Sequence, residues 1–194
     1  MFTGIIQSVM PVLAVTEKEA CLVARLKKPA GWKLVLGQSI TVDGICSTVT
    51  KLGASFFEVE YMPETLEKTT AGTFVGGQWV NLERSLTLRD YIDGHLVSGH
   101  VDATGKTVRI VADENTKRIS IEIPRALQKY IAQKGSVAVN GISLTVADVK
   151  KNVFTIALIP YTLEHTNLGL LKEGESVNVE IDTVARYVER MLQK

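Results

Sequence analysis

The side chains best suited to acid, base or nucleophilic chemistry in this 194-residue chain are its three histidines and two cysteines. His95 and His100 lie within the short stretch 94–101, and histidine is the side chain that titrates near neutral pH. This stretch is therefore the best candidate for proton transfer. A histidine in a strand also serves packing more often than catalysis, so both interpretations stay open at this point.

The cysteines and the short motifs of the chain exclude several kinds of site. Cys21 and Cys46 are not spaced as C-x-x-C and have no histidine beside them, so the sequence predicts neither a disulfide framework nor a zinc site. There is no phosphate-binding loop of the Walker type and no G-x-G-x-x-G. No carboxylate cluster indicates a metal, and no Ser-His-Asp triad follows from the spacing.

An internal duplication is the main feature that organises these residues. Residues 39–83 recur as residues 136–180, shifted by 97 positions without a gap, and seventeen of the forty-five paired positions are identical. The period is too long for the units of a solenoid or propeller, so each copy is predicted to be a domain with its own core. A chain with two such domains is predicted to hold two similar pockets.

The register of the repeat also matches polar side chains. The matched pairs are Ser39 with Ser136, Cys46 with Ser143, and Thr48 with Thr145. A free cysteine is usually a small core residue, but that interpretation predicts Val or Ala opposite Cys46 rather than Ser. The hydroxyl groups fit either turn capping or ligand binding. Near the start of each copy, His100 stands where the first copy has Ile5.

Composition and charge limit the partners of the protein. Basic residues number 22 and acidic residues 21, without a basic run, which argues against a nucleic-acid partner. The longest apolar stretches are shorter than a membrane span, and the amino terminus lacks the basic start of a signal peptide. We therefore expect no membrane association and a cytoplasmic location. Domains this small gain from packing against other subunits, which favours an oligomer.

Short runs rich in Val, Ile and Thr, separated by Gly, Asn and Asp, predict strands and turns. Six strands in each copy indicate a small closed antiparallel barrel. A short helix is expected to start at Pro63 and at Pro160, because proline fits the first position of a helix. The predicted strands are residues 4–15, 20–27, 38–42, 46–52, 56–61 and 78–84 in the first copy, and 99–111, 119–123, 136–139, 143–149, 153–158 and 176–181 in the second.

The carboxy-terminal stretch has a helical pattern instead. Its apolar stripe consists of Val184, Tyr187, Val188, Met191 and Leu192. These residues recur at the spacing of one helix face. A helix of this length must bury its stripe to be stable, either on its own barrel or against another subunit.

Four blocks in this order resemble the motifs of the alpha-type riboflavin synthases, a family built from two lumazine-binding repeats. They are Met-Phe-Thr-Gly-Ile-Ile at 1–6, Gly-His-Leu-Val-Ser-Gly-His-Val at 94–101, Asn-Gly-Ile-Ser-Leu-Thr-Val at 140–146, and Ile-Pro followed by Thr-Leu-Glu at 159–164. The resemblance covers essentially the whole chain. It implies an all-β fold of two homologous six-stranded Greek-key barrels in tandem, at residues 1–94 and 95–181, with an oligomerisation helix at 182–194.

The resemblance also implies a reaction. A four-carbon unit passes from one molecule of 6,7-dimethyl-8-ribityllumazine to a second, giving riboflavin and 5-amino-6-ribitylaminouracil, and no cofactor is needed. Two identical substrates explain two similar pockets, since positioning both molecules makes their encounter effectively intramolecular. The family implies a homotrimer held by carboxy-terminal helices and leaves association with lumazine synthase open. The main rival is a non-catalytic relative that carries a lumazine or flavin.

The residues that match the family's functional positions fall into three groups. Those tied to chemistry are His100, Cys46 and Ser39. Those expected to line the first pocket are Gly4, Ile5, Ile6, Cys46, Ser47, Thr48, Glu60, Tyr61, Met62, Pro63, Glu64 and Thr65. Those expected to line the second pocket are Gly99, His100, Val101, Lys134, Ser143, Leu144, Thr145, Ala157, Leu158, Ile159, Pro160, Tyr161 and Thr162.

The chain departs from the family pattern at three positions. The first repeat has Asp43 and Ser47 where the family usually has Asn and Leu. In the second repeat Tyr161 replaces a common Glu, which the first repeat retains as Glu64. These changes bear on the affinity of the second pocket.

Overall fold

Alternation of apolar and polar residues builds the strands, because successive side chains of a strand point to opposite faces of a sheet. In β2 (Cys21–Lys27), Leu22, Ala24 and Leu26 are buried while the residues between them are partly accessible. The same period recurs in β8 (Thr116–Glu122), where Ile119 and Ile121 are buried. Each strand therefore contributes one face to a core.

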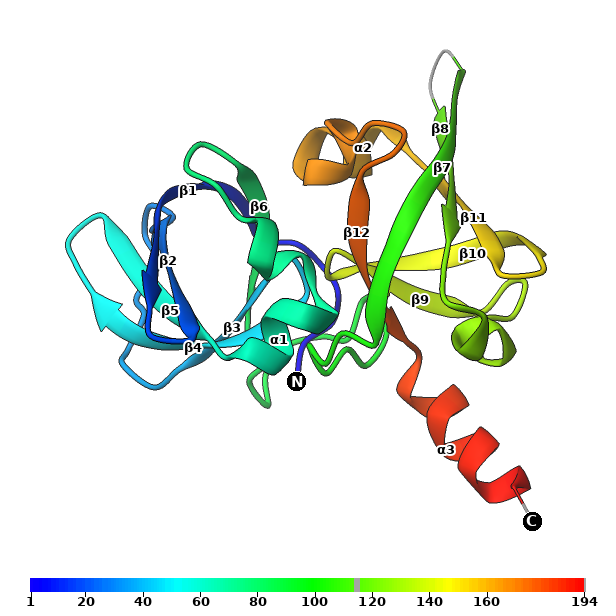
Figure 1. Ribbon diagram of the computed structural model, residues 1–194, viewed down its shortest axis with the longest axis horizontal. Coiled ribbons are helices and arrows are strands. Elements are labelled where there is room, and N and C mark those ends of the chain that lie inside the picture. The colour runs from blue at the N-terminus through cyan, green and yellow to red at the C-terminus, as the bar shows by residue number, and fades with distance from the viewer. Residues whose placement is uncertain (114–115, 194) are drawn as a thin grey trace.

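The computed structural model describes residues 1–113 and 116–193, and it contains two closed antiparallel barrels that lie side by side (Figure 1). The first consists of β1 (Ser8–Lys18), β2, β3 (Ser39–Val42), β4 (Ile45–Leu52), β5 (Phe56–Tyr61) and β6 (Trp79–Arg84), in the spatial order β1-β2-β5-β4-β3-β6. The second consists of β7 (Ala103–Asp113), β8, β9 (Ser136–Val139), β10 (Ile142–Lys150), β11 (Val153–Leu158) and β12 (Ser176–Ile181), in the order β10-β11-β8-β7-β12-β9. The predicted pair of six-stranded barrels is confirmed.

The duplicated residues fold in the same way twice. β3 and β9, β5 and β11, and β6 and β12 each begin and end 97 positions apart. Helices α1 (Pro63–Lys68) and α2 (Pro160–His165) follow the same shift and start at the predicted prolines. The described residues also form the short 3-10 helices η1 (Thr70–Thr73), η2 (Arg125–Tyr130) and η3 (Asn167–Gly169).

Two of the strand predictions began four residues too early, and the one at 119–123 began three residues after the start of β8. β1 starts at Ser8 rather than at residue 4, and β7 starts at Ala103 rather than at residue 99. Gly4 and Gly99 have φ angles of 76° and 79°, which lie in the left-handed region and interrupt a strand. We refer to residues 3–6 as the first lead segment and to residues 98–101 as the second lead segment.

Each barrel encloses its own apolar core. Phe57, Leu26 and Ile40 are among the fully buried residues of the first core, and Phe154 and Ile156 are among those of the second. A third, small cluster of Phe2, Val97 and Ala138 lies between the barrels. The two barrels are therefore joined by a contact that involves the amino terminus.

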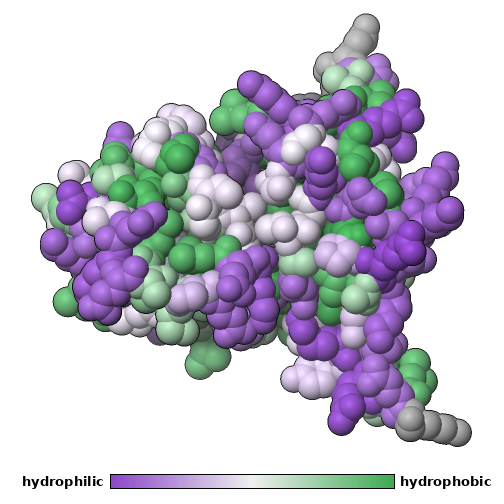
Figure 2. Space-filling view, viewed as in Figure 1, coloured by the Kyte–Doolittle hydropathy of each residue, from purple (hydrophilic) through white to green (hydrophobic). Residues whose placement is uncertain are grey.

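The chain ends in α3 (Thr183–Leu192), which projects away from the second barrel (Figure 1). Asp182 caps its amino terminus by accepting a hydrogen bond from the Val184 N–H. Hydrophobic residues on this projecting part are visible among hydrophilic ones in Figure 2. The predicted stripe is exposed, and the exposed fraction of Met191 is 84 %. The stripe therefore does not dock on its own barrel.

Among the helices of the described residues, none combines the length and the apolar character needed to cross a membrane.

Candidate functional site

The lead segments cross between the barrels. The Cys46 N–H on β4 donates to the Gly99 carbonyl at 2.8 Å, and the Ser143 N–H on β10 donates to the Gly4 carbonyl at 2.8 Å. A Cβ atom added to Gly99 would come within 2.7 Å of the Cys46 Cβ, and one added to Gly4 within 2.6 Å of the Ser143 Cβ. Glycine is therefore required at both crossings.

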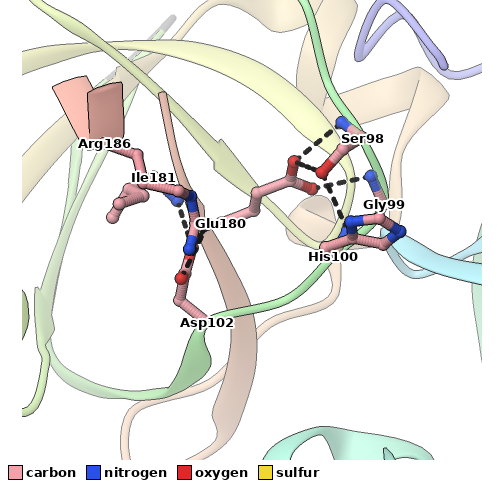
Figure 3. Close-up of polar contacts among 7 residues, drawn as sticks. All are labelled: Ser98, Gly99, His100, Asp102, Glu180, Ile181 and Arg186. Atoms are coloured by element: carbon pink, nitrogen blue, oxygen red, sulfur yellow. Dashed lines mark hydrogen bonds and ion pairs between the residues drawn. The ribbon is translucent and has the colours of Figure 1, made fainter. Parts of the chain in front are cut away.

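A buried glutamate holds each lead segment in place. Glu180 on β12 accepts hydrogen bonds from the Ser98 N–H at 2.7 Å, the Ser98 hydroxyl at 2.6 Å and the Gly99 N–H at 3.0 Å (Figure 3). The Ser98 Oγ in turn accepts the His100 N–H at 3.2 Å. Glu180 thus fixes the backbone that carries the candidate proton-transfer residue.

Glu83 on β6 does the same for the first lead segment. It accepts the Thr3 N–H at 2.7 Å, the Thr3 hydroxyl at 2.7 Å and the Gly4 N–H at 3.0 Å. Burial raises the pKa of the Glu83 carboxyl, and these hydrogen bonds oppose the rise. Glu83 and Glu180 were not among the candidate site residues, although their identity at matching positions of the repeat was a signal that could have found them.

The crossing corrects how the predicted pocket residues were grouped. Gly99, His100 and Val101 lie beside Cys46 of the first barrel rather than with the second, and Val101 packs against the first core. Ile6 packs against the second core in the same way. Each lead segment thus lies on the barrel opposite to the one whose pocket the family resemblance assigned it to.

We define the first half-site as the surface formed by β4, α1 and the second lead segment. It contains a cavity of about 270 Å³ that brings together residues of both copies. The cavity is lined by Ile45, Cys46, Glu64, Thr65, Lys68, Thr69, Gly99, His100 and Val101. A neighbouring cavity of about 490 Å³ shares Lys68, His100 and Val101 with it and extends to Arg186 on α3.

The outer face of β3 and β4 brings the third candidate residue to this half-site. Ser39 is directly opposite Thr48 in the ladder, and Thr41 is opposite Cys46. Side chains that oppose each other in a ladder share a face, so Ser39, Thr48 and Cys46 lie on one surface. His100 is exposed above it, whereas Ser39 and Cys46 are partly buried.

Some of the predicted lining residues point into the barrels instead. The Ser47 hydroxyl donates to the Ile45 carbonyl at 2.9 Å and lies 3.0 Å from the Tyr61 hydroxyl, and both side chains are buried. Burial raises the pKa of the Tyr61 hydroxyl. Leu158, at the position that matches Tyr61, is also buried. These three side chains lie in the cores beneath the half-sites.

We define the second half-site as the surface formed by β10, α2 and the first lead segment. Its exposed or partly exposed predicted residues are Ile5, Ile6, Ser143, Thr145, Ala157, Ile159, Pro160, Tyr161 and Thr162. Their counterparts on the first half-site include Glu60, Met62, Pro63 and Thr65, none of which is buried. The partly buried Leu144, which matches Ser47, packs against the second core instead. Lys134 is exposed on the turn that leads into β9, with a left-handed φ of 67°.

His95 joins the second half-site. The His95 Nδ1 lies 2.7 Å from the Ser143 Oγ, and the His95 backbone N–H donates to the Thr3 carbonyl at 3.2 Å. Its Nε2 is buried without a hydrogen-bond partner. Burial lowers the pKa of the His95 imidazole, which favours the neutral ring.

Asp43 and the asparagines lie at the seam between the barrels rather than on a half-site. Asp43 Oδ1 accepts the Asn81 N–H at 2.7 Å and the Asn167 Nδ2 at 2.8 Å. The Asn81 Nδ2 donates to the Asn140 carbonyl, and the Asn178 Nδ2 donates to the Asp43 carbonyl. The identical asparagines of the repeat thus brace one barrel against the other. Burial raises the pKa of Asp43 to about 7.

Within residues 1–113 and 116–193, no group of three or more His, Cys, Asp or Glu side chains is arranged to hold a metal ion.

Comparison with known proteins shows which family shares this architecture. The lumazine binding domain family matches the chain twice, over residues 3–85 and 98–182. Riboflavin synthases from Brucella abortus and Actinobacillus pleuropneumoniae are 41 % and 38 % identical, over 100 % of this chain in both cases and over 98 % and 91 % of the respective relatives. The chain belongs to the riboflavin synthase family. Both matched ranges begin at a lead segment, which this family's domain therefore includes.

Solved structures share the fold. The crystal structure of LumP complexed with riboflavin has a TM-score of 0.87 at 23 % sequence identity, covering 93 % of this chain and 99 % of that one. LumP complexed with 6,7-dimethyl-8-(1'-D-ribityl) lumazine has a TM-score of 0.84 at 21 % identity, covering 93 % and 98 %. The tandem barrels are thus common to this family and to LumP.

Proposed function

We propose that this protein is a riboflavin synthase, which converts two molecules of 6,7-dimethyl-8-ribityllumazine into riboflavin and 5-amino-6-ribitylaminouracil by four-carbon transfer. The observation that carries the proposal is the pair of matched half-sites, each completed by a lead segment from the other barrel. Two like surfaces suit two molecules of one compound. Membership of the riboflavin synthase family supports the same activity.

The roles follow from the chemistry of the proposed substrate. Its 7-methyl group is acidic because the carbanion is delocalised into the pteridine ring, so a modest base suffices. We propose that His100 assists this proton transfer, since its ring is exposed on a backbone that Glu180 holds. Cys46 or Ser39 is proposed to add to the ring of a bound lumazine: its sulfur or oxygen bonds to a ring carbon, the π electrons of that carbon–nitrogen double bond move to the nitrogen, and the nitrogen takes up the proton of the thiol or hydroxyl. No cofactor enters this scheme.

The active assembly is proposed to be a homotrimer, in which the first half-site of one subunit faces the second half-site of another. The exposed apolar stripe of α3 supports a subunit contact. Arg186 on α3 contacts both oxygens of Asp102, at 2.9 and 3.1 Å, and Asp102 follows directly on the second lead segment (Figure 3). Assembly and the first half-site are thereby linked.

We propose that the chain divides into two domains at residues 1–94 and 95–181, followed by an oligomerisation helix at 182–194. Residue 194 lies outside the described part of the chain. The lead segments show only that each barrel needs residues from the other domain to complete its surface. The cytoplasm is the proposed location. Association with lumazine synthase is a separate expectation of the family resemblance.

The second candidate function is a carrier that binds a lumazine or flavin without converting it. The fold shared with the LumP complexes favours this alternative. A carrier requires the half-site surface but gives no chemical role to Cys46, Ser39 and His100.

Incubating the purified protein with 6,7-dimethyl-8-ribityllumazine separates the two functions. A synthase converts the absorption spectrum to that of riboflavin and releases the pyrimidine product, at one mole of each per two moles of lumazine. A carrier binds the lumazine and leaves the spectrum unconverted. Constant spectra with saturable binding would therefore reject the enzyme.

A further inference from the structure

A cavity of about 440 Å³ lies at the seam between the barrels, and no described residue that lines it also lines the cavities of the first half-site. We call it the seam cavity. The turns at Asp43 and Asn140, the starts of β6 and β12, and residues of η1 and η3 form its walls, so both copies of the repeat contribute to it. Its volume falls within the range of small-molecule pockets, roughly 300–1,000 Å³. The seam cavity is therefore large enough for a ligand of its own.

Asp43 presents an unsatisfied carboxylate oxygen to this cavity. Asp43 is 2 % exposed, and its Oδ1 accepts the Asn81 N–H and the Asn167 Nδ2. Its Oδ2 accepts no hydrogen bond from the described residues. Oδ2 is also not one of the side-chain atoms that are enclosed without a partner, so it keeps access to the cavity that Asp43 lines. A buried acceptor without a donor is costly, which leaves Oδ2 for a donor from a ligand.

The charge of the seam cavity favours a cation. Asp43 and Glu175 line it, and none of the described residues that line it is Lys, Arg or His. Lys117 lies near Glu175, but its ammonium donates to backbone carbonyls within residues 168–171. Burial raises the pKa of Asp43 to about 7, and no cation among the described residues counteracts this rise. A ligand that carries a positive charge on N–H groups would compensate the carboxylate.

The seam cavity also has an apolar side. Trp79 and Leu170 line it with exposed fractions of 49 % and 65 %, and Leu171 lines it as well. An indole face attracts a cation and stacks on a flat ring. The repeat matches Trp79 with Ser176, so the first copy supplies this face and the second does not. Carboxylate and indole together suit a flat cation.

We infer that the seam cavity is a further ligand site, which binds a small organic cation with an amidinium or protonated amine group on a flat apolar body. Asp43 Oδ2 accepts a hydrogen bond from the cationic group, and Trp79 packs on the apolar body. The ligand contacts both barrels, because the walls of the cavity come from both copies. This inference does not depend on the proposed function, since it uses none of the half-site residues.

Benzamidine and benzamide are matched probes, because they have nearly the same size and shape and only benzamidine is charged. Both are titrated into the native full-length protein in a calorimeter at pH 8, where the Asp43 carboxyl is ionised. Asp43→Asn removes the charge and keeps the acceptor for Asn81 and Asn167. Its control is Glu17→Gln, which removes an exposed carboxylate of β1 outside the cavity. Trp79→Ala tests the indole face.

Benzamidine is expected to bind at one site per chain, about tenfold more tightly than benzamide, since a charged hydrogen bond is stronger than a neutral one. Asp43→Asn should weaken benzamidine binding about tenfold and leave benzamide binding unchanged. Trp79→Ala should weaken the binding of both probes about threefold. Glu17→Gln should change neither, and saturating riboflavin should not displace benzamidine.

Four results would each overturn the inference: no benzamidine binding, equal affinities of the native protein for the two probes, binding that Asp43→Asn leaves unchanged, or competition by riboflavin. Lumazine conversion by the same preparations is measured separately. A failure of the seam site and a failure of the proposed function are therefore distinguishable.

Discussion

At the scale of single residues, the side chains proposed for chemistry depend on partners in the other barrel. His100 belongs to the second copy by sequence, yet it lies in the cavity of the first half-site with Cys46. Its backbone is held by the Ser98 and Glu180 contacts rather than by a strand. Held in this way, His100 keeps its backbone position while its ring stays exposed.

Replacing His100 with alanine is expected to reduce lumazine turnover at least tenfold, because general acid–base groups typically contribute factors of about 10²–10⁴. The fold should survive, since the ring is exposed and the segment is anchored through its backbone. Steady-state turnover and circular dichroism measure the two effects. Unchanged turnover would remove His100 from the mechanism.

Asp43 makes folding depend on pH. Its pKa rises from 3.8 to about 7 on burial, so the folded state favours the neutral carboxyl. Its stabilising contribution is complete below pH 3.8, declines as the pH rises, and is lost above pH 7. Asp43→Asn keeps the acceptor for Asn81 and Asn167 and removes the charge. We expect this variant to be more stable than the native protein at pH 8 by about 1–3 kcal/mol, and by less at pH 5.

Urea denaturation at the two pH values measures that difference. Asn140 occupies the matching position and its Oδ1 accepts the Asn178 N–H at 2.8 Å, so Asn140→Asp is the mirror control. This control should introduce a loss of stability that grows with pH. A stability gap for Asp43→Asn that is independent of pH would contradict the assignment of burial as the cause.

At the scale of elements, the lead segments turn two barrels into two composite surfaces. Both have a glycine in the left-handed region where the chain touches the opposite barrel. At such a position a side chain meets two obstacles, the unfavourable φ angle and the approach of the neighbouring strand. These two costs can be measured separately.

Gly99→Ala is expected to destabilise the protein by about 2–4 kcal/mol and to weaken ligand binding at the first half-site, because the new Cβ would meet Cys46. Gly31 has a similar φ of 78°, and a Cβ atom added there would meet nothing within 4 Å, so Gly31→Ala should cost only about 1 kcal/mol. Thermal denaturation and riboflavin titration compare the two variants. Equal effects on stability and binding would show that the crossing does not constrain Gly99.

Much of this architecture could be predicted because the repeat and the strand patterns are local properties of the sequence. Pro63 and Pro160 indicated the short helices for the same reason. The crossing could not be predicted, because an exchanged segment and a segment that stays with its own barrel have the same local pattern. The contact of Gly99 with Cys46 depends on the packing of two complete barrels.

The roles of individual side chains were partly predictable as well. The repeat pointed to Ser39, Cys46 and Thr48, which share a surface. The repeat did not show that the Ser47 side chain faces the core, while that of the next residue, Thr48, faces outward. A one-residue step along a strand reverses the direction of a side chain, and the family motif contains both directions.

At the scale of the whole molecule, α3 carries a stripe of apolar side chains that remains accessible in a single chain. Lys129 on η2 and Glu189 form an ion pair that orients it, and Asp102 with Arg186 forms a second. Salt bridges at an exposed surface contribute little to stability, so they fix direction rather than hold the helix tightly. The stripe therefore stays accessible, as the proposed trimer contact requires.

Deleting residues 184–194 is expected to yield monomers in sedimentation velocity and to lower turnover at least tenfold, because the stripe is then missing from the proposed trimer contact. Each barrel has its own core and should stay folded. A double variant, Lys51→Ala with Lys150→Ala, changes exposed charges that lie outside α3 and its ion pairs, and it should remain trimeric. A truncated protein that sediments as an active trimer would contradict this role of α3.

The crossing of the second lead segment also determines when the first half-site is completed during synthesis on the ribosome. The last strand of the first barrel ends at Arg84, whereas the residues that complete its ligand surface are Gly99, His100 and Val101. A nascent chain therefore contains every strand of the first barrel before it contains the lead segment that completes the first half-site. We expect a fragment that ends within the connection to lack Gly99, His100 and Val101, so a ligand of the first half-site should not protect it from proteolysis.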